Sequence, residues 1–157
     1  MGNKFNRLTK FQTAIIIGIL GVILVAWIDL QGFNLLGEDY TNGNFPSTVW
    51  PHHLLTALII FLIPAICYWV FYKKDKSEFT AIYWTGLILF YFGLADVFYF
   101  LLMGNPIPSV LPWLNGHIII GNIAKAAGSE VTREVLLISV ALGFILVYFI
   151  TKKLEKI

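Results

Sequence analysis

The chain has 157 residues, of which 58% are hydrophobic and 13% are charged, and its formal net charge is +2. A soluble domain is closer to half apolar and a quarter charged, so these few charges could not cover a water-soluble globule. The composition therefore excludes such a globule and predicts an integral membrane protein. The single cysteine, Cys67, excludes a disulfide within the chain and disfavours a thiolate zinc site.

Four long apolar segments are expected to cross the bilayer, at about residues 11–30, 52–72, 79–103 and 133–151. Each is close to the roughly 20 residues that span the hydrocarbon as a helix. Helices are required because unpaired backbone groups cannot be left in lipid. We therefore expect an all-α fold in which residues 1–157 form a single transmembrane domain, a four-helix bundle. The first segment lacks a small-residue cleavage site, so we interpret it as a retained anchor.

The basic residues predict the orientation of this bundle. Nine of the 11 lysines and arginines lie before the first segment, between the second and third, or after the fourth. Only Lys125 and Arg133 fall on the other side. The positive-inside rule then places both termini in the cytoplasm of a multi-pass cell-membrane protein. These short basic flanks match membrane anchoring, with a weak attraction to anionic lipid, and nucleic-acid binding is disfavoured.

The connection at about residues 104–131 differs from an ordinary loop. Pro106, Pro108 and Pro112 exclude a continuous helix, yet the stretch has no charged residue before Lys125. It is too apolar for a solvated loop. We expect an outer cap that is re-entrant or lies in the membrane interface, with a short amphipathic helix near 116–127.

Small residues at helical spacing indicate contacts between the spans, because lipid gives helices no hydrophobic reason to associate. They are Ala14 and Gly18, Ser139 and Gly143, and Gly86 with Gly93. Packing within the bundle is the simpler interpretation, and contact between copies in a homo-oligomer is the alternative.

Asp96 is the most informative ionisable residue, because it lies inside the third apolar segment. A charge at the bilayer centre costs about 2.5–3.5 kcal/mol on insertion scales, and less toward the edge. Two interpretations stay open. Asp96 is either a carboxyl group bonded to a neighbouring span, or it takes part in binding a ligand, a proton or a metal.

The three histidines and several acids are all expected in the outer half of the bundle. Adjacent helical residues point about 100° apart, so only one of His52 and His53 would face inward, and we favour His53. Asp29, His53, Asp96 and His117 come from different segments at a similar membrane level, and Glu134 opens the fourth span. Structural alternatives are an end-of-span carboxylate for Asp29, an interfacial histidine pair, and a backbone-bonded loop histidine for His117.

If these side chains converge, two kinds of site become available. Asp29, His53, Asp96 and His117 could ligate a divalent transition metal ion such as zinc, iron, copper or manganese. Alternatively, Asp96, His53 and His117 could act as catalytic acids and bases in a low-dielectric pocket. No motif with the fixed spacing of a known metal or catalytic site is present.

Three functional hypotheses follow from this pattern. The leading one is a polar site in the extracytoplasmic half that binds an amphipathic or lipid-like molecule, with or without a metal. The second is a non-enzymatic accessory subunit of a larger membrane complex, whose aromatic residues and apolar cap contact a partner. The third is a homo-oligomeric transporter, which the charge-free inner halves of the spans disfavour.

Overall fold

The computed structural model describes residues 10–36, 49–73 and 76–154, with side chains described in these ranges except at 10–11, 32–36, 49–54 and 72–73. This part of the chain is helical and has no strand, apart from one isolated antiparallel bridge between Val110 and Thr132. The helices in chain order are α1 (Lys10–Leu36), α2 (Val49–Tyr68) with a π-helical turn η2 (Trp69–Lys73), α3 (Lys76–Tyr91), α4 (Leu94–Met103), the 3-10 turn η3 (Pro112–Gly116), α5 (Ile120–Ala126) and α6 (Arg133–Leu154).

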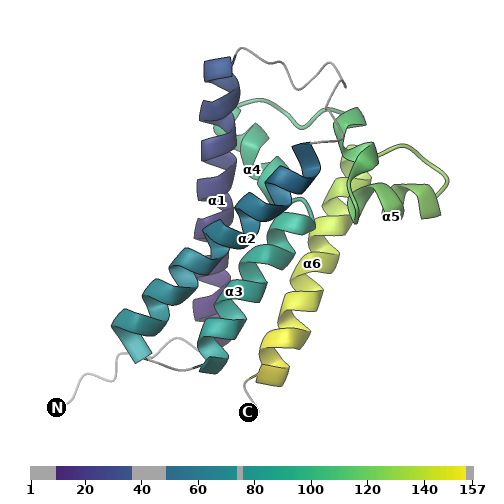
Figure 1. The fold of residues 1–157 in the computed structure, drawn as a ribbon. Helices are drawn as coiled ribbons and strands as arrows, with labels where there is room; N and C mark the ends of the chain where they lie inside the picture. The colour runs from purple at the N-terminus through teal and green to yellow at the C-terminus, as the bar shows by residue number, and fades with distance from the viewer. Residues whose placement is uncertain (1–9, 37–48, 74–75, 155–157) are drawn as a thin grey trace.

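Helix α3 lies at the centre of the bundle and packs against α1, α2 and α6 (Figure 1). Successive long helices run in opposite directions, so α1 and α3 point toward one end of the bundle while α2 and α6 point away from it. That end also holds α4, η3 and α5, and we call it the cap end. The opposite end, where α3 starts at Lys76 and α6 finishes with Lys152 and Lys153, is the lysine end.

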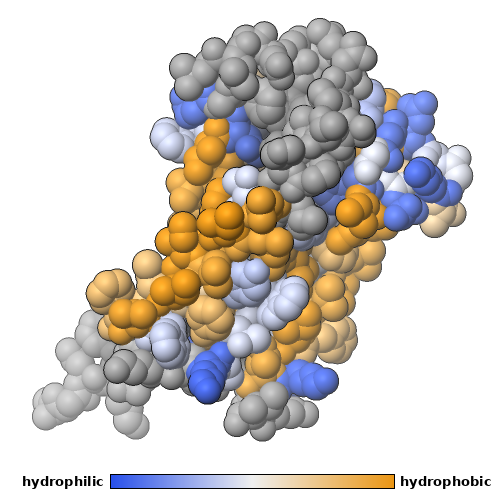
Figure 2. Space-filling model, viewed as in Figure 1, coloured by the Kyte–Doolittle hydropathy of each residue, from blue (hydrophilic) through white to orange (hydrophobic). Residues whose placement is uncertain are grey.

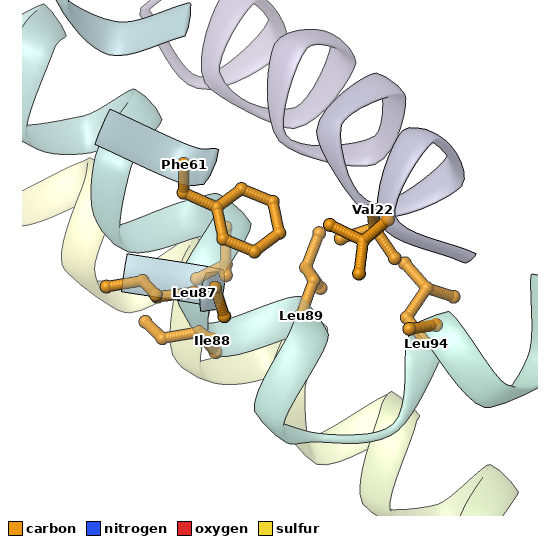
Figure 3. Packing of buried hydrophobic residues seen from close by; sticks show 10 residues of the cluster. Val22, Phe61, Leu87, Ile88, Leu89 and Leu94 are labelled. Carbon is orange, nitrogen blue, oxygen red and sulfur yellow. The ribbon is translucent and has the colours of Figure 1, made fainter. Parts of the chain in front are cut away.

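Glycines allow the three central helices to approach one another closely. The ring of Phe61, from α2, lies where a side chain on Gly86 of α3 would be, and also against Gly21 of α1. Figure 3 shows Phe61 of α2 next to Leu87 of α3, and Val22 of α1 next to Leu89, in this core. Such contacts supply van der Waals packing, which holds helices together where lipid provides no hydrophobic drive.

The small residues singled out in the sequence are contact positions, as predicted. Ala14 is fully buried, and a Cβ on Gly18 would lie 2.7 Å from Thr85 Cγ2 of α3. On α6, Ser139 is fully buried and Gly143 receives the side chain of Phe92. These contacts lie within one chain, so they account for the small residues without contact between copies.

The third apolar segment, expected as one span over 79–103, is broken. Its two parts, α3 and α4, are bent by 69° relative to each other. Gly93 lies between them with a φ of 91°, in the left-handed region that L side chains rarely adopt. A Cβ there would overlap Leu136 of α6 and lie 2.8 Å from Ile120 Cδ1 of α5. The helix therefore turns where only glycine fits both the backbone and the packing.

Two helices in the described part of the chain are long and apolar enough to cross a membrane, within Gln12–Gln31 of α1 and Arg133–Leu154 of α6. The bent pair α3–α4 makes up to three, and Leu55–Phe71 is a shorter apolar helix. Figure 2 shows hydrophobic side chains over α2 and α6, with hydrophilic residues near the cap and at the foot of the bundle. This distribution is consistent with a helical membrane protein.

The break at Gly93 can be tested against a second glycine with a similar backbone. Gly104 also has a positive φ, of 69°, but nothing lies within 4 Å of the position that a Cβ would take there. Gly104→Ala should therefore cost only the backbone strain, about 1–2 kcal/mol. Gly93→Ala should cost about 1–3 kcal/mol more, because the methyl group overlaps two packed side chains. Thermal unfolding of the detergent-solubilised variants measures the difference, and equal losses would contradict the close packing at Gly93.

Candidate site at the cap end

The segment between α4 and α6 folds into a small apolar core of its own. Residues 111, 113, 114, 120 and 131 are all buried, and they pack against Phe100 of α4 and Leu136 of α6. Trp113 lies with its ring 6.1 Å from that of Phe100. Because α4 bends away from α6, the two helices leave a wedge between them, and this core fills it. The apolar character noticed in the sequence is explained by burial against the protein.

Backbone hydrogen bonds hold the two ends of this segment together. Leu111 N donates to Val131 O at 2.8 Å, and Arg133 N donates to Ser109 O at 3.1 Å. The side chain of Asn115 accepts a hydrogen bond from Val131 N at 2.9 Å. The stretch between residues 111 and 131 is therefore fastened at both ends, and η3 and α5 are fixed relative to α6.

His117 is buried and lies between η3 and α5, three residues before α5 begins at Ile120. Its Nδ1 accepts hydrogen bonds from the backbone N–H groups of Ile119 and Ile120, both at 3.3 Å, while its carbonyl oxygen accepts one from Gly121 N at 3.0 Å. Its φ of −70° and ψ of 133° are typical of a residue that caps a helix N-terminus. Burial lowers the pKa of His117 to about 4, so the ring is neutral at pH 7. The hydrogen bonds to Nδ1 are those of the backbone-bonded alternative, and the His117 ring also lies 6.3 Å from the ring of Tyr91.

Asp96 lies in the first turn of α4, close behind the break. The break creates a new helix N-terminus whose first N–H groups lack partners within the helix, and a carboxylate there is favourable. The carboxyl group of Asp96 lies within reach of two donors, its own backbone N–H and the indole N–H of Trp113. It lies deep in the cap end but keeps part of its surface exposed. Asp96 therefore joins α4 to the cap through Trp113.

The sequence does not single out Trp113 as a partner of Asp96. One signal is present, because a buried indole N–H needs an acceptor and Trp113 stands in an apolar run without one. Only the fold shows that the acceptor comes from residue 96.

Asp29 of α1 is an acidic neighbour of Asp96. The two carboxyl groups are close enough for their charges to repel each other. Both residues are partly exposed, and α1 packs along α4. In the part of the chain that the structure describes, no lysine or arginine forms an ion pair with either of them. The structure therefore brings two of the four predicted site residues together as an acid pair.

The other predicted residues are placed differently. Glu134 is exposed at the start of α6, and Arg133 Nη2 lies 3.3 Å from its carboxylate oxygen. His52 and His53 are in the first turns of α2, but their side chains lie outside the described residues. Whether His53 reaches the acid pair stays a prediction.

The metal hypothesis has little support from the described residues. Among them, no group of three or more His, Cys, Asp or Glu side chains could hold a metal ion. Asp29 and Asp96 supply two carboxylates, whereas Nδ1 of His117 accepts hydrogen bonds from the backbone. A third ligand would have to come from a side chain such as that of His53.

No family model, no curated protein and no solved structure matches the chain.

The capping role of His117 predicts a pH-dependent stability. Its pKa is about 4 when folded and about 6.5 when unfolded, so the unfolded chain binds the extra proton between these values. The contribution is fully present above pH 6.5 and is lost as the pH falls toward 4. Thermal unfolding of the wild type should therefore occur at a lower temperature at pH 5 than at pH 7.

His117→Asn is the matched control for this experiment, because asparagine also caps helices but does not titrate. Its unfolding temperature should change less between these two pH values. His117→Ala should lose about 1 kcal/mol at pH 7, since the two N–H groups lose their acceptor. An equal pH dependence in His117→Asn and the wild type would assign the effect to other groups.

Proposed function

We propose that the chain crosses the membrane four times, with both termini in the cytoplasm, and binds an amphipathic molecule at the acid pair of the cap end. The observation that carries the ligand proposal is the pairing of Asp29 and Asp96 from two helices, with no basic ion-pair partner in the described part of the chain. The four spans would be α1, α2 with η2, the bent α3–α4 pair, and α6.

The topology is supported by the direction of the helices and by the lysines. Basic residues occur in the sequence at the start of α1 and α3 and at the end of α2 and α6. All four of these helix ends lie at the lysine end of the bundle (Figure 1). Basic residues on one side of a membrane protein mark its cytoplasmic face. The cap end would then be extracytoplasmic.

The proposed topology also gives the depth of the acid pair. Asp29 lies 19 residues after Lys10 in α1, which at 1.5 Å per residue is about 28 Å along the helix axis. The hydrocarbon core of a bilayer is about 30 Å thick. If Lys10 marks the inner boundary, the pair lies close to the outer one, where burying a charge costs less than at the centre.

The surroundings of the pair indicate the chemistry of its ligand. Two neighbouring carboxyl groups favour a cation or a hydrogen-bond donor between them, because their charges otherwise repel each other. Beyond the pair, α4 ends in Leu101, Leu102 and Met103, which are 64%, 43% and 41% exposed. A molecule with an ammonium head and an apolar tail would satisfy both surfaces. A divalent metal ion is the competing occupant.

The topology predicts which sides of the membrane can be labelled. In a Cys67→Ser background, Lys76→Cys should react with a membrane-impermeant maleimide only from the cytoplasm, and Ser129→Cys only from outside. Both positions are exposed, so burial does not prevent labelling. Labelling of both positions from the same side would contradict an odd number of crossings between them and hence the four-span topology.

Ligand binding is tested with a fluorescent dodecylamine as the probe and purified protein in neutral detergent. Asp29→Asn and Asp96→Asn should each weaken binding about tenfold or more, because a hydrogen bond to a charged group contributes about 1.5–3 kcal/mol. Glu130→Gln changes an exposed acid of the cap end outside the pair and should bind like the wild type.

Two results would contradict the proposal. One is equal binding by the wild type and both Asn variants, with unchanged thermal stability. The other is tight binding of zinc or manganese by the wild type, lost in both Asn variants, without any binding of the amine probe. The latter would assign the acid pair to a metal ion.

A further inference from the structure

In the described part of the chain, the lysine end presents three exposed lysine side chains. Lys76 at the start of α3 is exposed, as are Lys152 and Lys153 at the end of α6. Glu78, two residues after Lys76, is only 4% exposed and accepts a hydrogen bond from the Tyr68 hydroxyl at 3.2 Å. Figure 2 shows hydrophilic side chains at the foot of the bundle, directly beside the hydrophobic band.

The sequence predicts a strong charge asymmetry between the two sides of the membrane. The segments expected on the cytoplasmic side contain nine basic and three acidic residues, a formal charge of +6. The segments expected on the outer side contain two basic and six acidic residues, a formal charge of −4. The net charge of +2 is the sum of these two opposite charges.

Aromatic residues fix the level of these lysines relative to lipid. Lys152 Nζ donates a hydrogen bond to the hydroxyl of Tyr148 at 3.1 Å, one turn earlier on α6. Tyr148 is 44% exposed and Phe149 is 62% exposed. Tyrosine prefers the boundary between hydrocarbon and headgroups, so the ammonium groups reach the level of the lipid phosphates.

We propose that the lysine end binds the phosphate groups of anionic lipids in preference to neutral ones. The partner is identified by charge complementarity, since each lysine near a membrane surface attracts anionic headgroups. Because the lysines are exposed side chains around the foot of the bundle, the contact is a ring of lipids rather than a closed pocket. This inference goes beyond the proposed ligand site, which concerns the opposite end.

The test uses the full chain in phosphatidylcholine vesicles that contain a trace of spin-labelled phosphatidylglycerol or spin-labelled phosphatidylcholine. Electron paramagnetic resonance measures how strongly each labelled lipid associates with the protein. The wild type should prefer phosphatidylglycerol several-fold, and this preference should fall as salt screens the charges. In the variant Lys76→Gln/Lys152→Gln/Lys153→Gln the ratio of the two associations should approach one.

Two control variants separate charge from structure. Lys125→Gln removes an exposed lysine of the cap end and should keep the preference of the wild type. Replacement of Lys76, Lys152 and Lys153 by arginine keeps the charges and should keep the preference as well. Since the labelled lipids are present in both leaflets, the result does not depend on the proposed orientation of the chain.

Three outcomes would overturn the inference. They are a wild type without preference, a glutamine variant that keeps the full preference, and a preference removed by inorganic phosphate but not by chloride at the same ionic strength. The last would assign the lysines to free phosphate instead of lipid.

Discussion

The close packing around Gly93 determines the shape of the cap end. The positive φ of Gly93 ends α3, and the side chains of Leu136 and Ile120 occupy the space that a larger residue at this position would need. The chain can then continue only at an angle, and α4 leaves at 69° from α3. Every feature of the candidate site depends on this change of direction, because a straight helix would leave no wedge for the cap and no helix N-terminus at Asp96.

Polar side chains of three residues stabilise the chain at and beyond the break. The carboxyl group of Asp96 lies at the new N-terminus, within reach of the indole N–H of Trp113, so these two residues connect α4 to the cap. His117 accepts the first N–H groups of α5, and Asn115 accepts one from the segment before α6. In lipid, each of these groups would be costly without a partner. Asp96 and His117 therefore have structural roles, and these roles do not explain why Asp29 lies near Asp96.

The sequence predicts the parts of this fold that depend on composition and on short spacing. Apolar length identifies α1 and α6, and the small residues Gly18 and Gly143 mark contacts with neighbouring helices that the structure contains. It does not predict the break, because Gly93 lies in an apolar run and nothing local distinguishes a bend from a straight helix. The sequence does not predict the contact between Trp113 and Asp96 either, because the two residues are 17 positions apart in the chain. His117 has two interpretations in the sequence, and only its backbone contacts separate them.

The bend between α3 and α4 is measured most directly as a distance between spin labels at Lys76 and Met103 in a Cys67→Ser background. Both positions are exposed, so the labels should not disturb the core. With a bend of 69°, two helical segments of these lengths separate the labelled backbone positions by about 34 Å at 1.5 Å per residue. A continuous helix would separate them by about 40 Å. Double electron–electron resonance should give the shorter distance, and a distribution centred near the longer one would contradict the broken helix and the site built on it.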